Sequence, residues 1–283
     1  MIPHFSSKNT KIFLLSFAHK LGLGSVLAFV AGLVNSVGFL GFGQFVSHVS
    51  GHATFAAVQY SEQYYTLALT SFSALFFFIT GAAFTAILLK GKTVEDIDTT
   101  YAWPLFIEAI LLFYVVLGSF YYNDMLLTKD SYGHANYFLI LSFAMGMQNA
   151  TLRKEQGSHI RTTHMTGTAT DIGVAIGSAF VGGVLEICQR IKISKKKKEI
   201  SHTSEILVDS VKVFYIKSRV ERLFLHVTTL FSFGVGAIVG TFGFLRYHFF
   251  ILTIPMFLLF VITVFEIRSR NIKRKLREND KSK

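Results

Sequence analysis

Long apolar runs separated by short charged stretches are the main pattern of the sequence. A membrane-spanning helix needs about 20 apolar residues, and six runs come close to or exceed that length: 21–43, 64–89, 102–122, 134–150, 222–244 and 247–266. Two further stretches, 44–60 and 162–189, are apolar but interrupted by Gly, Ser, Thr and His. The pattern predicts an all-α membrane protein with six transmembrane helices and two broken segments.

The composition agrees with this class. Only 16% of the 283 residues are charged, against about 25% in a soluble domain. The single cysteine, Cys188, excludes a disulfide framework and a cysteine-based zinc cluster. No His-Glu-x-x-His pattern occurs in the sequence, so we predict neither a metal site nor a cofactor.

Lys and Arg gather beside the apolar runs. The net charge is +11, and four basic segments carry the excess: 1–20, 151–161, 190–221 and 267–283. Basic segments next to membrane spans stay on the cytoplasmic side. We therefore predict an integral membrane protein with both termini in the cytoplasm. The expected partner of such a protein is the lipid bilayer, and no nucleic-acid partner is expected.

A motif of polar and small residues occurs twice. The first copy reads Ala31-Gly32-Leu-Val-Asn35-Ser36 and then His48-Val-Ser50-Gly51-His52-Ala53-Thr54. The second reads Met145-Gly146-Met-Gln-Asn149-Ala150 and then His164-Met-Thr166-Gly167-Thr168-Ala169-Thr170. Agreement at so many polar positions indicates a duplicated chain.

Three spans in each half mean that the second half enters the membrane from the opposite side. The sequence therefore predicts a 3+3 inverted repeat, the plan of many transporters, in which broken helices from the two halves form the binding site. The chain is predicted to begin with a cytoplasmic tail (1–20) and a first membrane repeat (21–122). The second repeat starts at 134–189 and ends with two spans at 222–266, with a basic cytoplasmic linker (190–221) between these parts. A basic cytoplasmic tail (267–283) follows.

The same residues carry a resemblance to a known family. The segments Met145–Ala150 and Arg161–Gly173, and less specifically Ala31–Leu40, resemble the hallmark of the YoaK family of multi-spanning bacterial membrane proteins. The resemblance covers about 20–270. The first copy departs from the family pattern, which often has Asp where this chain has Asn35 and Asn where it has His52. The resemblance implies a fold and a location, the bacterial inner (plasma) membrane, but no substrate.

Histidine, amide and hydroxyl groups are costly in lipid, so we expect those of the motif to face the protein interior or water. The preferred function is transport or permeation of a small solute. The predicted binding residues are Asn35, His48, Ser50, Thr54, Asn149, His164, Thr166, Thr170 and Asp171.

Structural explanations exist for several of these positions. Gly and Thr also serve as packing residues between membrane helices. Asp171 could be a charge at the start of a helix beginning near Ile172, and Glu108 a group that pairs or snorkels at the interface. The spacings Gly173-x-x-x-Gly177 and Gly236-x-x-x-Gly240 indicate close packing, within the chain or between copies of a homo-oligomer.

Two other functions stay open at this stage. One is a membrane-embedded enzyme that uses the histidines. The other is a non-catalytic scaffold or sensor whose basic segment 190–222 recruits anionic lipid or a partner protein.

Overall fold

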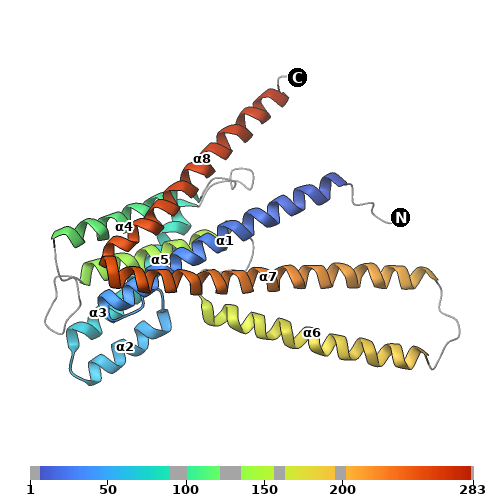
Figure 1. Cartoon of the computed structure of the whole chain (residues 1–283), viewed down its shortest axis with the longest axis horizontal. Coiled ribbons are helices and arrows are strands. Elements are labelled where there is room, and N and C mark those ends of the chain that lie inside the picture. The colour runs from blue at the N-terminus through green and yellow to red at the C-terminus, as the bar shows by residue number, and fades with distance from the viewer. Residues whose placement is uncertain (1–6, 90–100, 122–134, 156–162, 195–201, 282–283) are drawn as a thin grey trace. The chain divides into compact units, whose positions relative to one another are not determined.

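The computed structural model describes residues 7–89, 101–121, 135–155, 163–194 and 202–281 (Figure 1). The regular structure in these ranges is helical, as predicted. The elements are α1 (Ser7–Phe42), α2 (Val49–Ser61), α3 (Tyr65–Leu88), α4 (Ala102–Tyr121), α5 (Ala135–Glu155), α6 (Met165–Ser194), α7 (His202–Tyr247), the short 3-10 helix η2 (His248–Leu252) and α8 (Thr253–Lys281).

A glycine ends α1 and creates the first break. Gly43 has a left-handed φ of 73°, and its amide donates to the Phe39 carbonyl at 2.9 Å, a common way for a helix to end. The chain continues without regular helix to His48, and α2 begins at Val49. With 13 residues, α2 is about 20 Å long and therefore shorter than the roughly 30 Å hydrocarbon core of a bilayer.

The second break also precedes its motif. Residues 156–162 lie outside the described ranges, and α6 then runs as one helix of 30 residues from Met165. The stretch 162–189, predicted to be broken, is therefore helical from Met165 onward. The second part of the linker expected at 190–221 is continuous with the span expected at 222–244, because α7 covers both.

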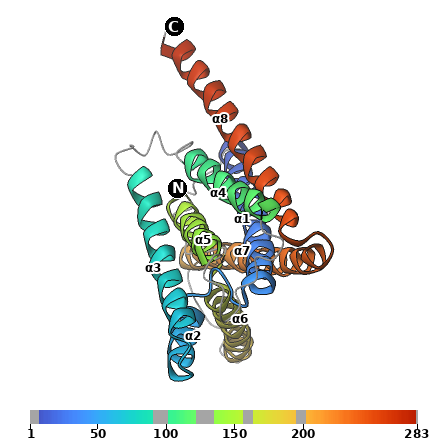
Figure 2. The same cartoon turned by 90° about the vertical axis from the view of Figure 1, so that its left-hand side faces the viewer.

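The chain forms two compact units, residues 1–163 with 231–283, and residues 164–230. In the second unit, α6 and the beginning of α7 lie side by side as an antiparallel pair (Figure 1). In the first unit, α5 packs against α1, α3 and α4 (Figure 2). The central position of α5 explains why its side chains include fully buried ones, namely Phe138, Leu141, Ser142, Met145, Met147 and Gln148.

Glycines create two close helix crossings in the first unit. Gly32 of α1 and Gly236 of α7 each lie against the other helix, where a Cβ would overlap the carbonyls of Phe233 and Phe29. Gly81 of α3 and Gly146 of α5 do the same with the carbonyls of Phe143 and Phe78. The Gly236-x-x-x-Gly240 spacing therefore packs within the chain, since Gly240 also faces α1.

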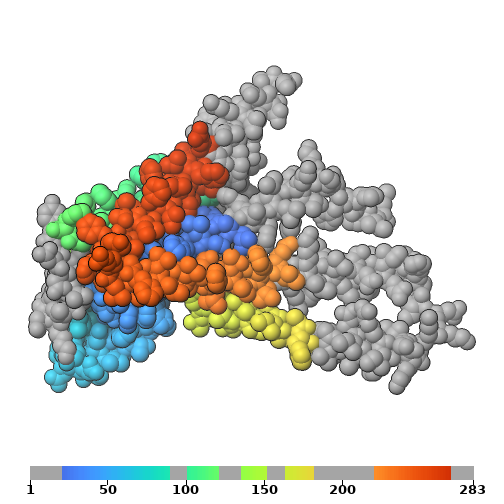
Figure 3. Space-filling view, viewed as in Figure 1, coloured from blue at the N-terminus to red at the C-terminus, as the bar shows by residue number. Residues whose placement is uncertain are grey.

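The pair α4 and α8 completes the first unit. A proline is the third residue of each helix, Pro104 in α4 and Pro255 in α8. In the first turn of a helix an N–H has no acceptor within the helix, so proline costs no hydrogen bond there. The helices pack against each other, and α8 (red) crosses α4 (green) in the space-filling view (Figure 3). At one end Phe120 meets Phe250 edge to face, with ring centroids 4.6 Å apart.

Four segments of the described chain are long and apolar enough to cross a membrane: Leu21–Phe42, Tyr65–Leu88, Ala102–Phe120 and Val220–Arg268. The last has 49 residues and contains the two spans predicted at 222–244 and 247–266. The span predicted at 134–150 falls on α5, which is not among these four segments. Large apolar side chains are exposed along these segments, among them Phe72, Phe76, Phe231, Phe242 and Phe257, as expected of surfaces that face lipid.

Candidate functional site

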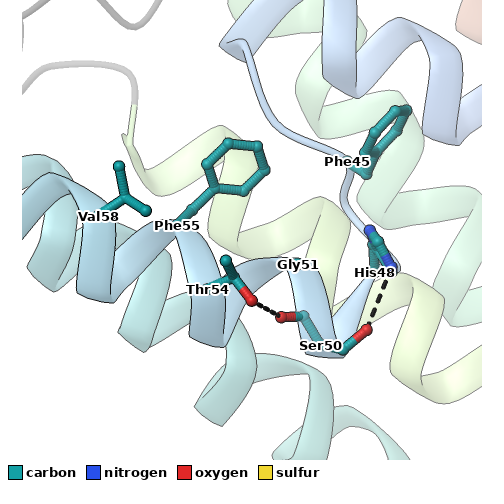
Figure 4. Close-up of a pocket in the computed structure, with 7 residues that line it drawn as sticks. All are labelled: Phe45, His48, Ser50, Gly51, Thr54, Phe55 and Val58. Atoms are coloured by element: carbon teal, nitrogen blue, oxygen red, sulfur yellow. Dashed lines mark hydrogen bonds between the residues drawn. The ribbon is translucent and has the colours of Figure 1, made fainter.

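A pocket of about 370 Å³ lies along α2 (Figure 4). Its walls are formed by Phe45, His48, Ser50, Gly51, Thr54, Phe55 and Val58. Three of the predicted binding residues, His48, Ser50 and Thr54, are therefore found together, and all three are exposed. The other walls are aromatic or aliphatic. Such a pocket suits a small solute with one polar end.

The polar groups of the pocket contact one another at the start of α2. The Ser50 hydroxyl and Nε2 of His48 are 3.2 Å apart, and the hydroxyl donates when Nε2 carries no proton. Thr54 donates its hydroxyl proton to the Ser50 carbonyl at 3.0 Å (Figure 4). No side chain caps α2. The first backbone amides of the helix, which form its positive end, are therefore without a side-chain partner beside the pocket.

Asn35 holds the residue that precedes this motif. Its side-chain oxygen accepts hydrogen bonds from the amide of Ser47 at 3.1 Å and from the Ser47 hydroxyl at 3.0 Å. These bonds fix the chain immediately before His48. Asn35 is not among the residues that line the pocket, so its observed contacts are those of a positioning residue.

Asn149 makes the corresponding contacts in the second copy. Its side-chain oxygen accepts a hydrogen bond from the amide of Thr163 at 3.3 Å, and its side-chain amide donates to the Thr163 hydroxyl. Thr163 immediately precedes His164, as Ser47 precedes His48. The two breaks are therefore held by the same kind of contact.

The second unit contains the other four predicted residues, His164, Thr166, Thr170 and Asp171. All four are exposed. The His164 carbonyl accepts hydrogen bonds from the amide and the hydroxyl of Thr168, at 3.1 and 3.2 Å. Thr170 donates to the Thr166 carbonyl at 2.9 Å, which matches the bond from Thr54 to Ser50.

Asp171 has a partner that the sequence did not suggest. One of its carboxylate oxygens is 4.0 Å from Nε2 of His226 on α7. The interpretation of Asp171 as a helix-start charge is wrong, because α6 begins at Met165 and Asp171 lies in the second turn. His226 is a polar residue within an apolar run, and that signal could have identified it.

A buried polar cluster beneath α2 also escaped the sequence analysis. The Ser71 hydroxyl of α3 lies 2.8 Å from Oε1 of Gln44, in the break, and 2.7 Å from Oε1 of Gln59, on α2. Ser71 and Gln44 are buried. The cluster connects the break, α2 and α3, and so supports the helix that carries the pocket.

Two buried ionisable side chains have polar atoms without a hydrogen-bond partner among the described residues. His52 is 1% exposed, its ring packs edge to face on Phe138 at 5.7 Å, and its Nε2 has no hydrogen-bond partner among the described residues. Glu108 is 0% exposed, and in the described part of the chain neither of its oxygens has a hydrogen-bond partner. The expectation that Glu108 pairs or snorkels is therefore wrong.

Four long apolar segments and a helical interior make this chain a polytopic helical membrane protein. Within the described ranges, no three His, Cys, Asp or Glu side chains come together as metal ligands would. The chain belongs to the family described as "Protein of unknown function (DUF1275)", whose sequence pattern matches residues 23–265. This range agrees with the extent of 20–270 inferred from the motifs. No curated protein and no solved structure matches the chain.

Proposed function

We propose that the protein carries a small solute across the membrane and binds it at the starts of the two motif helices, α2 and α6. One observation carries this proposal. Asn35 and Asn149 each hold the residue before a His-x-[Ser/Thr]-Gly helix start, so both motif helices begin from the same kind of contact. Interrupted helices at membrane level are typical of the binding sites of transporters with repeated halves.

The likeness of the two motif copies also supports a 3+3 inverted repeat. In this repeat, α1 to α4 correspond in order to α5 to α8. The motif glycines Gly32 and Gly146 both lie at close crossings, the first with α7 and the second with α3. These partners are themselves a corresponding pair. Pro104 and Pro255 occupy the third position of the last helix in each half. Together with the basic flanks, this correspondence supports our proposal of six spans with both termini in the cytoplasm.

The chemistry of the α2 pocket limits the kind of solute. His48 and Ser50 offer donors and acceptors on one side, while Phe45, Phe55 and Val58 offer apolar contacts on the other. A volume of about 370 Å³ is at the small end of the range for ligand pockets. We infer a small, partly polar metabolite. The predicted binding residues of the second copy, including Thr166, Thr170 and Asp171, provide similar groups.

Uptake of a labelled metabolite panel into proteoliposomes tests this function. Thr54→Ala and Thr80→Ala form a matched pair, because each hydroxyl bonds a carbonyl of its own helix but only Thr54 lines the pocket. We expect Thr54→Ala to change the uptake of the transported solute and Thr80→Ala to leave it unchanged. Equal uptake by all three proteins would remove the pocket from the proposal.

A second candidate is the membrane-embedded enzyme, and the contact between Ser50 and His48 favours it. A hydroxyl hydrogen-bonded to an imidazole at 3.2 Å is the minimum arrangement of a nucleophile and its base. Labelling with a fluorophosphonate probe distinguishes the two functions. Modification of Ser50 that is lost in His48→Ala would support an enzyme, whereas an unmodified Ser50 in a protein that takes up solute supports transport.

A further inference from the structure

Glu108 of α4 is a fully buried carboxyl. It is 0% exposed, and neither of its oxygens has a hydrogen-bond partner in the described part of the chain. Its neighbours on the same helix face, Leu105, Ala109 and Leu112, belong to the buried apolar core. An ionised carboxylate is strongly disfavoured in such surroundings unless it is paired, so the side chain is neutral in this conformation.

Among the described side chains of the elements packed against α4, none hydrogen-bonds Glu108 to hold its ionised form. These elements are α8, α5, η2 and, to a smaller extent, α3. Their described titratable or charged side chains are Tyr65, Tyr137, His248, Glu266 and Arg268, with Tyr101 and Tyr114 on or beside α4 itself. None of them hydrogen-bonds Glu108. A neutral carboxyl without partners still loses the hydrogen bonds that it makes in water. A buried glutamate therefore contributes no packing stability that a leucine would not also contribute.

We propose that Glu108 is a proton-binding site that couples protonation to a change of conformation. In the described conformation, α8 covers α4 (Figure 3) and the carboxyl holds its proton. When α4 and α8 separate and water enters, the O–H bond breaks, the carboxylate stays on the protein and a water molecule takes the proton. A buried ionisable group within a membrane span is a functional candidate for this reason.

This inference deepens the proposed function, because it assigns protons as the coupling ion of the proposed transporter. It predicts that acidic conditions favour the closed arrangement of α4 and α8. It also predicts that the ionised form, and with it the separated arrangement, becomes more populated as the pH rises. The sign follows from the carboxyl being neutral in the closed arrangement and charged only where water reaches it.

Dicyclohexylcarbodiimide tests the proposal on the full-length protein in liposomes without any solute. This apolar reagent adds to a protonated carboxyl: the carboxyl oxygen bonds to the central carbon, and the acid proton moves to a nitrogen of the reagent. Mass spectrometry then locates the adduct. Glu62, which is exposed, is the internal control, because we expect it to react with a water-soluble carbodiimide and not with the apolar one.

We expect an adduct on Glu108 at about pH 5 that falls by about tenfold or more towards about pH 9. The adduct should be absent in Glu108→Gln. An unmodified Glu108 at every pH, or equal modification across the range, would overturn the proposal, because the carboxyl would then be permanently inaccessible or permanently neutral. Since the wild type alone gives this result, poor folding of the variant does not affect the test.

A transport measurement separates this proposal from the proposed function. Glu108→Gln keeps the size of a neutral carboxyl but cannot release a proton. If solute uptake is pH-dependent in the wild type, the variant should lose that pH dependence; if it keeps the wild-type pH profile, the coupling role is refuted while transport stands. Conversely, pH-dependent labelling in a protein that moves no solute would retain the proton site and refute transport.

Discussion

The side-chain oxygen of Asn35 accepts two hydrogen bonds from Ser47, one from its amide at 3.1 Å and one from its hydroxyl at 3.0 Å. These bonds join the end of α1 to the last residue before the His48 motif. Because the amide of a residue outside a helix has no intrahelical acceptor, the bond from Ser47 satisfies a donor that would otherwise be unpaired at membrane level. The Asn35 side chain thus holds the end of the break that lies next to His48.

Replacement of Asn35 should therefore depend on whether the acceptor is kept. Asn35→Leu removes it and leaves two donors of Ser47 unpaired, so we expect the free energy of unfolding to fall by about 1–3 kcal/mol. Asn35→Asp keeps the two accepted bonds, and we expect a melting temperature close to that of the wild type. Thermal unfolding in detergent measures both.

Ser25→Ala is a suitable control for this series. Its hydroxyl bonds only the Leu21 carbonyl of its own helix, at 2.7 Å, so its loss should have little effect. Equal melting temperatures for Asn35→Leu and Ser25→Ala would contradict the positioning role of Asn35.

The glycines of α7 offer a matched pair two residues apart. At Gly236 a methyl group would overlap the Phe29 carbonyl of α1, whereas nothing lies within 4 Å of the corresponding point at Gly234. We expect Gly236→Ala to destabilise the protein by about 1–3 kcal/mol through overpacking. Gly234→Ala should be neutral or slightly stabilising, since Ala is the better helix former. Melting temperatures that fall equally would show that the crossing of α1 and α7 is not close.

The sequence predicted the parts of the fold that depend on the pattern of side chains. The apolar runs predicted the helical membrane class, and the repeated polar motif located both helix starts. The distribution of Gly and Thr also suggested broken segments, but the observed break does not lie where this pattern placed it. The first break lies before its motif because Gly43 ends α1 by its left-handed backbone, and the motif residues from Val49 onward are helical.

The contacts between distant residues were not accessible from the pattern. Nothing in the spacing of Ser71, Gln44 and Gln59 indicates that they meet, because the cluster depends on how α2 folds back onto α3. The burial of the Glu108 side chain was not predicted for a related reason. Its position near one end of an apolar run suggested the interface, whereas the packing of α8 and α5 around α4 buries it completely. A linear sequence carries no direct record of such coverage.

The contact between Asp171 and His226 should contribute little energy on its own. The Asp171 side chain is 53% exposed and the two atoms are 4.0 Å apart, so solvent and side-chain motion weaken the interaction. A double-mutant cycle with Asp171→Asn and His226→Gln should give a coupling energy of about 0.2–1 kcal/mol. A coupling energy well above this range would indicate a buried, strongly ordered pair.

The six-span arrangement makes a prediction about the two ends of the motif helices. If α1 crosses outward and α2 does not cross, the turn after α2 lies outside the cell, whereas the end of α6 lies in the basic cytoplasmic linker. Cysteines introduced by Gln63→Cys and Ser194→Cys in a Cys188→Ser background should therefore react from opposite sides. Gln63 is exposed, so a membrane-impermeant maleimide added to intact cells should label the first cysteine and label the second only after lysis. Labelling of both in intact cells would refute the arrangement, because a fully crossing α6 would carry the segment of Lys195 to Lys198 to the outside and the second half would no longer be the inverted counterpart of the first.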